Sequence, residues 1–249
     1  MAITMNTTQP SSDIRQDPSY RAFSELPANQ RIRERWWRQR WSYVATKALT
    51  DWELLSMADP RGKRILNVGC SEPIDEFLYA GIAGHWTTID FVEAQLQTAS
   101  RVLDEDLAPA RRSGVSLCTA NAVRLPFADA TFDIALAFST IEHIPDPDDR
   151  HQAIRELARV TRPGGHVIIT LPNLFSLAPL AHVYWQLTGQ ANYGFVRSYA
   201  PFQLRRQLRQ AGLKLLRFTS EYKLPTWPHF MNLLPMRFGM RMGYLAQKR

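Results

Sequence analysis

Five short apolar segments alternate with helix-like segments between residues 63 and 173 of this 249-residue chain. Apolar runs of this length, bounded by turn residues, are typical of strands buried on both faces of a parallel sheet. Strands that alternate with helices of about 10–15 residues indicate such a sheet with helices on both faces. The expected strands are residues 63–70, 85–91, 115–121, 132–139 and 166–173, and the expected helices are 73–80, 93–105 and 150–160.

The remainder of the chain extends the same pattern. A helix over 201–212 and strands over 213–222 and 241–249 bring the expected total to seven strands. Asp148 or Asp149 is expected to cap the helix over 150–160, which the stretch 162–165 (RPGG) should end. The pattern predicts an α/β, Rossmann-like, doubly wound and mostly parallel sheet.

Composition excludes several other classes of protein. No run of about 18 apolar residues is present, so a transmembrane helix is not expected. Cys70 and Cys118 do not make a disulfide framework or a zinc ribbon, and no metal site is expected. Residues 1–18 are polar, lack the pattern of a secretory signal and should be disordered, so a cytoplasmic protein is expected.

Charge and aromatic residues are distributed unevenly. Residues 151–249 carry 14 Lys/Arg against 2 Asp/Glu, net +12, whereas residues 61–150 are net −6. Such asymmetry suggests surfaces with opposite ligand preferences, or merely solvated charges. Residues 19–60 are expected to form an N-terminal helical lid in which arginines and tryptophans interleave. Packing of those tryptophans on the sheet, or RNA binding, are the alternatives for this segment.

The residues that end the predicted strands point to a ligand site. In an open parallel sheet, ligands bind beyond the carboxyl ends of the strands. Asp90, which ends the second strand, lies 21 residues after Gly69, which ends the first. This spacing suits a carboxylate that accepts hydrogen bonds from both hydroxyls of a ribose. A nicotinamide dehydrogenase fits less well, because G-x-G-x-x-G is absent.

Over residues 63–173 the chain resembles the class I S-adenosylmethionine-dependent methyltransferases, in the branch that acts mostly on small molecules. The resemblance is strongest in NAVRLPFADATFDIALAFSTIEHI (121–144) and LARVTRPGGHVIITLPN (157–173). It implies S-adenosylmethionine as the cofactor. The chain departs from the family pattern at Asn67, where an acidic residue is usual, and at Ser71 and Pro73, where glycines are usual. Asn121 stands where an aspartate commonly reaches the adenine.

The resemblance also assigns roles to individual residues. Asp90 would hold the ribose, Phe91 would pack on the adenine, and Ser139 would lie near the methionine part. The full set expected to bind the cofactor is Gly69, Cys70, Ser71, Glu72, Asp90, Phe91, Asn121, Ala122 and Ser139. Structural alternatives stay open for several of them: a tight turn at Gly69, a helix cap at Asp90, core packing of Phe91 and turn chemistry at Asn121.

Methyl transfer requires mainly in-line placement of the nucleophile, and a general base helps when that nucleophile must lose a proton. His143 is the candidate base and Glu142 the candidate partner that orients it or binds the cofactor's amino group; a structural role in the loop is the alternative. The acceptor pocket is expected in apolar insertions around 174–200 and 223–240. The candidate substrate-binding residues are Trp37, Tyr43, His182 and Tyr199, and His229 is a further candidate.

These observations predict an enzyme that methylates an O or N atom of a hydrophobic or acidic small molecule, such as a natural-product intermediate. The expected state is a monomer or homodimer with at most peripheral membrane contact. Two alternatives are left open. The altered glycine turn would suit a protein that keeps the fold but no longer methylates, and the basic final third would suit an RNA or protein methyltransferase.

Overall fold

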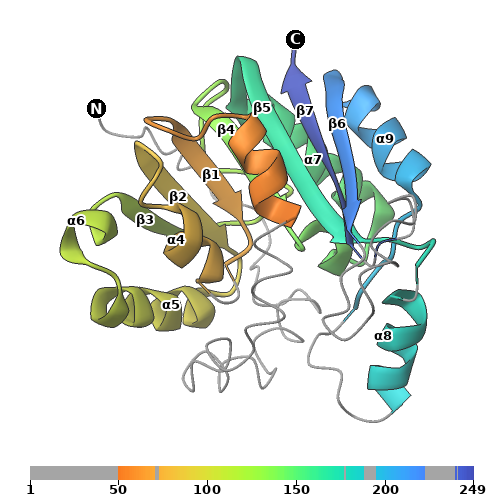
Figure 1. Ribbon diagram of the computed structural model, residues 1–249, viewed down its shortest axis with the longest axis horizontal. Coiled ribbons are helices and arrows are strands. Elements are labelled where there is room, and N and C mark those ends of the chain that lie inside the picture. Colours follow the sequence, from red (N-terminus) through yellow and green to blue (C-terminus); the bar gives the residue numbers. More distant parts are fainter. Residues whose placement is uncertain (1–49, 71–72, 177, 188–194, 222–238, 240) are drawn as a thin grey trace, which may run out of the picture.

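The computed structural model describes residues 50–70, 73–176, 178–187, 195–221, 239 and 241–249. Its centre is one sheet of seven strands in the order β3-β2-β1-β4-β5-β7-β6 (Figure 1). The strands are β1 (Arg64–Val68), β2 (His85–Asp90), β3 (Val115–Thr119), β4 (Phe132–Phe138), β5 (Thr161–Pro172), β6 (Leu213–Glu221) and β7 (Arg241–Lys248). The helices are α4 (Ile74–Tyr79), α5 (Glu93–Asp106), α6 (Pro109–Arg112), η3 (Ile141–His143), α7 (Pro147–Val160), α8 (Ala178–Leu187) and α9 (Pro201–Gln210). The predicted α/β fold class is confirmed.

The direction of the strands places the site. β1 to β5 run parallel, and β7 is antiparallel to both of its neighbours, β5 and β6. The chain passes from β1 outward to β3 and then returns to β4 on the other side of β1. The order therefore reverses between β1 and β4, and in open α/β sheets a crevice for ligands forms at such a point, beyond the carboxyl ends of the strands.

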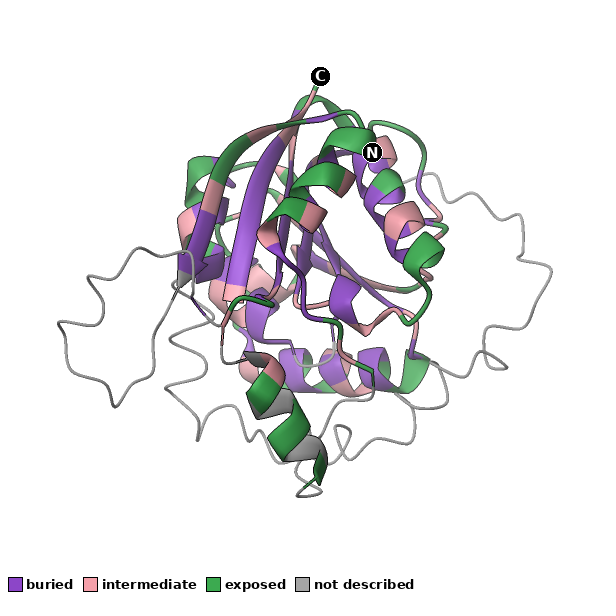
Figure 2. Ribbon diagram, turned by 90° about the vertical axis from the view of Figure 1, so that its right-hand side faces the viewer, coloured by how far each residue is buried: buried purple, intermediate pink, exposed green. Residues whose placement is uncertain are grey.

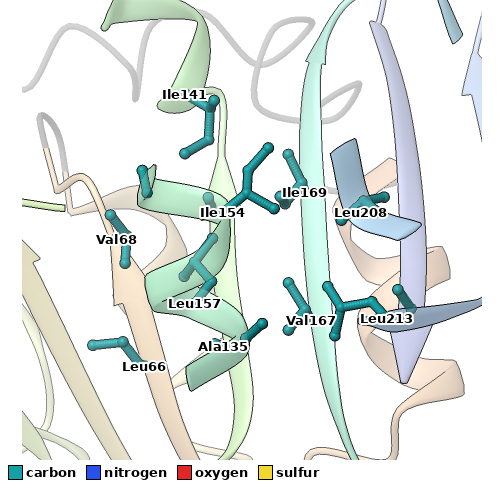
Figure 3. Packing of buried hydrophobic residues seen from close by; sticks show 14 of the residues in the cluster. Leu66, Val68, Ala135, Ile141, Ile154, Leu157, Val167, Ile169, Leu208 and Leu213 are labelled. Carbon is teal, nitrogen blue, oxygen red and sulfur yellow. The ribbon is translucent and has the colours of Figure 1, made fainter. Parts of the chain in front are cut away.

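Helices cover both faces of the sheet, which explains why its strands have continuous apolar sequences. On one face, Leu66 and Val68 of β1 belong to a buried cluster with Ile154 and Leu157 of α7 and residues of α9 (Figure 3). On the other face, Ile65 of β1 belongs to a cluster with residues of α5 and of the helical segment 50–57. Figure 2 shows the central strands buried and the outer sides of the helices exposed.

The helical segment 50–57 is bonded to the sheet through buried polar groups. Asp51 is fully buried, and its Oδ1 accepts hydrogen bonds from Thr170 Oγ1 at 3.0 Å and from Arg241 Nη2 at 3.1 Å. Glu53 accepts from Thr219 Oγ1 at 2.8 Å. This part of the predicted lid therefore belongs to the face of the sheet, while residues 19–49 of the lid, with Trp37 and Tyr43, lie outside the described residues.

Three local features differ from the sequence prediction. The cap of α7 is Asp146, whose side chain accepts from the amides of Asp148 and Asp149, rather than either of those residues. Pro147 decides the register, because proline fits the first helical position, where no amide donor is needed. β5 begins at Thr161, so the stretch 162–165 opens the strand rather than separating it from α7. Helix α8 was not predicted within the apolar insertion.

The Asp51–Arg241 pair gives a stability prediction. Asp51→Ala removes the carboxylate from a guanidinium whose side chain is only 15% exposed. We expect a loss of about 3 kcal/mol, because one charge of a buried pair is left without its partner. Denaturant unfolding followed by circular dichroism measures it.

Arg61→Ala is the control, since Arg61 and Asp59 form an exposed pair and no measurable change is expected. Equal effects of the two substitutions would show that the buried pair does not anchor the segment 50–57.

Candidate active site

Gly69 ends β1 in a backbone conformation that only glycine adopts easily, with φ of +92°. A Cβ built there would lie 2.7 Å from Thr140 Cγ2. Thr140 is itself held, because its hydroxyl donates to the carbonyl of Val68 at 2.7 Å. The loop after β4 is therefore packed directly against the turn after β1. The tight-turn role considered for Gly69 is present, and it brings two loops of the crevice together.

Asp90 connects this turn to the next strand. Its Oδ2 accepts from the Cys70 amide at 2.9 Å, and its Oδ1 accepts from the Val92 amide at 2.9 Å. The carboxylate is 7% exposed, and the residue at the cap position of α5 is Val92 rather than Asp90. An ionised carboxylate accepts about four hydrogen bonds, so ribose hydroxyls can be bound in addition to these two amides.

The loops after β2 and β3 lie side by side, as an adenine site requires. The Ala120 amide donates to the Asp90 carbonyl at 2.9 Å. Asn121 Oδ1 accepts from the Val123 amide at 3.0 Å, so the turn role considered for Asn121 is present. A carbonyl oxygen has two lone pairs, and the second suits the adenine amino group. Phe91 and Ala122 are both half-buried.

The loop after β4 begins with a strained residue. Ser139 has φ of +54°, which costs a non-glycine residue about 1 kcal/mol or more. Its amide donates to the Thr170 carbonyl at 2.8 Å, which fixes it to β5. Strain of this kind is concentrated at functional sites. Here it turns the chain from β4 into η3, which carries Glu142 and His143.

His143 has one ring nitrogen fixed by a backbone group. Nδ1 lies 3.0 Å from the carbonyl oxygen of Phe195. A carbonyl only accepts, so the neutral ring carries its proton on Nδ1 and its lone pair on Nε2. The contact holds the segment after residue 194, as the structural alternative predicts, and it also selects the tautomer with its lone pair on Nε2.

Glu142, in η3, and Tyr199 are both buried. Glu142 is 2% exposed, and its carbonyl accepts from the Arg197 amide at 2.8 Å. Tyr199 is 3% exposed; burial raises the pKa of its hydroxyl, Arg150 and Gln207 lower it, and the charge of Glu142 raises it. The Arg150 guanidinium donates to the carbonyls of Ile144 and Pro145 at 2.6 and 2.7 Å. Arg150 thus supports the loop after η3, and the predicted contact of Tyr199 with the acceptor stays a prediction.

The structure unites part of the predicted set. It brings together the ends of β1 to β4, with Gly69, Cys70, Asp90, Asn121 and Ser139. Ser71, Glu72 and His229 lie outside the described residues, and so does the side chain of His182. Sequence reasoning missed Thr140 and Arg150. The only signal for Thr140 was its place after Ser139, and Arg150 resembled a solvated helix residue.

The described residues contain no group of three or more His, Cys, Asp or Glu side chains that could hold a metal ion. None of the described helices has the length and apolar character needed to cross a bilayer. Neither Cys70 nor Cys118 forms a disulfide.

The Gly69–Thr140 contact gives a second prediction. A Cβ at Gly164 would meet no atom within 4 Å, so Gly164→Ala tests the left-handed backbone alone, at φ of +75°. We expect this substitution to lower the free energy of unfolding by about 1–2 kcal/mol. Gly69→Ala adds the collision with Thr140 and should cost distinctly more in denaturant unfolding. Equal losses at the two glycines would mean that Thr140 moves aside without cost.

Comparisons with known proteins identify the family. The family model described as a methyltransferase domain matches residues 66–169. An O-methyltransferase of Aspergillus nomiae, rstn1, is 32% identical over 71% of this chain and 75% of its own length. The O-methyltransferase resE of Aspergillus sclerotiorum is 30% identical over 71% of this chain and 64% of its own length. The ubiquinone biosynthesis O-methyltransferase of Aromatoleum aromaticum is 28% identical over 77% of this chain and 82% of its own length.

Solved structures share the fold. Magnesium protoporphyrin IX methyltransferase from Synechocystis, with S-adenosylhomocysteine bound, aligns with a TM-score of 0.59 at 16% identity, over 83% of each chain. The [4+2]-cyclase SpnF aligns with a TM-score of 0.59 at 20% identity, over 81% of this chain and 80% of its own. The turn at Gly69, where no side chain fits, and the hydrogen-bonded carboxylate of Asp90 fit S-adenosylmethionine as the cofactor. With its matched domain and relatives, this chain belongs to the class I S-adenosylmethionine-dependent methyltransferases.

Proposed function

We propose that this enzyme methylates a hydroxyl oxygen of a hydrophobic small molecule, with His143 as the general base. The observation that carries the proposal is the packing of Thr140 on Gly69, which sets η3 and His143 against the cofactor turn. The names of the relatives support the choice of oxygen, since all three are O-methyltransferases. Methylation of nitrogen is the outcome to be compared with it.

Residues at three strand ends would hold the cofactor. The turn at Gly69 and Cys70 would admit it close to the backbone, Asp90 would accept hydrogen bonds from the ribose, and the loop with Asn121 and Ala122 would receive the adenine. Ser139 would lie near the methionine part. Bound S-adenosylmethionine supplies a methyl group already activated on a sulfonium. The protein's task is therefore to place the nucleophile in line and to remove its proton.

His143 is suited to that removal. Because the Phe195 carbonyl fixes the proton on Nδ1, Nε2 can accept the proton of an acceptor hydroxyl as the oxygen attacks. The ring then becomes a cation whose Nδ1–H still donates to the same carbonyl. Glu142 is buried and precedes His143 in the chain. Its backbone carbonyl accepts a hydrogen bond from the Arg197 amide, which orients η3.

The apolar character of the acceptor follows from the segment between β5 and α9. Both views show α8 beyond the carboxyl ends of the parallel strands (Figures 1 and 2). It exposes Leu180, Val183 and Leu187, and Phe175 lies 6.3 Å from the ring of Phe202. These side chains suit the wall of a hydrophobic pocket or lid. The lid over residues 19–60, the insertion at 223–240, the oligomeric state and the cytoplasmic location remain predictions.

The cofactor site is tested by titrating the protein with S-adenosylmethionine in a calorimeter. Asp90→Ala removes the carboxylate that would bind the ribose, and we expect affinity to fall about 10–100-fold, the value of hydrogen bonds to a charged group. Asp129→Ala is the control, because Asp129 lies on the surface and pairs with Arg159. Unchanged affinity in Asp90→Ala would remove Asp90 from the site. No binding by the wild-type protein would favour a protein that no longer methylates.

The general base is tested by transfer of labelled methyl groups to a panel of hydrophobic phenols. His143→Gln should lower kcat about 10²–10⁴-fold while calorimetry shows cofactor binding retained. His151→Gln on α7 is the control and should leave kcat unchanged. Loss of cofactor affinity in His143→Gln with normal kcat would assign His143 to loop structure alone. Transfer to amines but not phenols would refute the hydroxyl acceptor.

A further inference from the structure

A buried polar cluster lies at the first turn of α4, outside the residues used above. The carboxyl of Glu76 is fully buried, and its Oε1 accepts from Asn67 Nδ2 at 3.0 Å and from Trp86 Nε1 at 3.1 Å. The Thr88 hydroxyl donates to the same oxygen. These partners come from β1 and β2, the two strands that end at the cofactor turn and at Asp90.

Two acceptor atoms of this cluster lack a donor. Among the described residues, neither Glu76 Oε2 nor Asn67 Oδ1 receives a hydrogen bond, and both are shielded from solvent. Leaving such atoms unsatisfied is costly. One proton on Oε2 converts it into a donor. The Asn67 carboxamide already donates a hydrogen bond from Nδ2 to Glu76 Oε1. A proton on Glu76 Oε2 would therefore be donated to Oδ1 of the same carboxamide.

The charges around Glu76 favour that proton. Burial raises the pKa of Glu76, the neighbouring charge of Asp75 on α4 raises it further, and hydrogen bonds from Thr88 and Asn67 lower it. The groups that contact the carboxyl from β1 and β2 are neutral: Asn67, Trp86 and Thr88. In the part of the chain that the structure describes, no cation is among the groups that shift this pKa.

We propose that Glu76 is a positioning residue for the cofactor turn, a neutral carboxyl that forms a two-bond ring with Asn67 and so joins the end of β1 to the start of α4. Asn67 precedes Gly69 by two residues, and Glu76 follows Pro73, the cap position of α4, by three. The ring therefore spans both ends of the turn 69–73. Its effect on binding rests on the proposed cofactor site, whereas its protonation does not.

Protonation is tested by the pH dependence of unfolding in Glu76→Gln and wild type. A native state that keeps the proton binds more protons than the unfolded state above the ordinary pKa of glutamate, so wild-type stability falls with rising pH until the raised pKa is passed. The wild-type folding constant should fall relative to that of Glu76→Gln by up to about tenfold per pH unit in that range.

Glu156→Gln is the matched control, because the Glu156 carboxylate pairs with Arg159 at 2.7 Å. Neutralising that carboxylate should lower the stability of the protein. Parallel pH curves for wild type and Glu76→Gln would refute the neutral carboxyl.

Positioning is tested by calorimetry with S-adenosylmethionine. Asn67→Asp sets a second carboxyl against Glu76 and should weaken binding at least about tenfold. Adding Glu76→Gln to it exchanges the acid and the amide, rebuilds the ring and should restore most of the affinity. Glu76→Gln should likewise bind more tightly than Glu76→Ala. Circular dichroism verifies that each variant is folded.

The outcomes separate the two ideas. Wild-type affinity in Asn67→Asp, or a double variant no better than Asn67→Asp, would refute the positioning role alone. A wild-type protein that binds no S-adenosylmethionine would refute the cofactor site and the positioning role together, and the unfolding experiment would still decide the protonation of Glu76.

Discussion

The contact between Gly69 and Thr140 is the constraint on which the rest of the site depends. It joins the loops after β1 and β4, the two strands between which the order of the sheet reverses. Every other element of the site is placed relative to one of these loops. Asp90 reaches the first through the Cys70 amide, and His143 follows the second within one turn of η3. A side chain at residue 69 would collide with Thr140 and push the two loops apart.

The strained backbone at Ser139 belongs to the same arrangement. Its conformation is unfavourable by itself, yet the hydrogen bond from its amide to the Thr170 carbonyl and the packing of Thr140 hold it in place. The strained residue thus stands at the entrance to η3, with β5 as its support. A buried, bonded strand beneath a strained loop is the arrangement expected where function requires a defined geometry.

Much of the architecture could be predicted from sequence, because strands buried on both faces leave apolar runs, and α5, α7 and α9 have amphipathic patterns. The meeting of Asp90 with the turn after β1 could also be predicted, because both stand at the carboxyl ends of neighbouring parallel strands. Other features depend on contacts far apart in sequence. The burial of Tyr199, the packing of Thr140 on Gly69 and the donation of Arg150 to Ile144 have no local signature. Helix α8 was missed because apolar residues without clear periodicity fit an irregular pocket equally well.

The position of β7 has a consequence for the order in which the sheet is completed. β7 lies between β5 and β6, although β6 precedes it in the chain, and β6 pairs with β7 alone among the described strands. Until residues 241–248 pair with β5, β6 has no described strand to join. α9 then also lacks the residues of β7 that share its buried cluster. The five parallel strands pair with one another without any help from β6 or β7. The far edge of the sheet therefore depends on the last strand of the chain, whereas the reversal point between β1 and β4 does not.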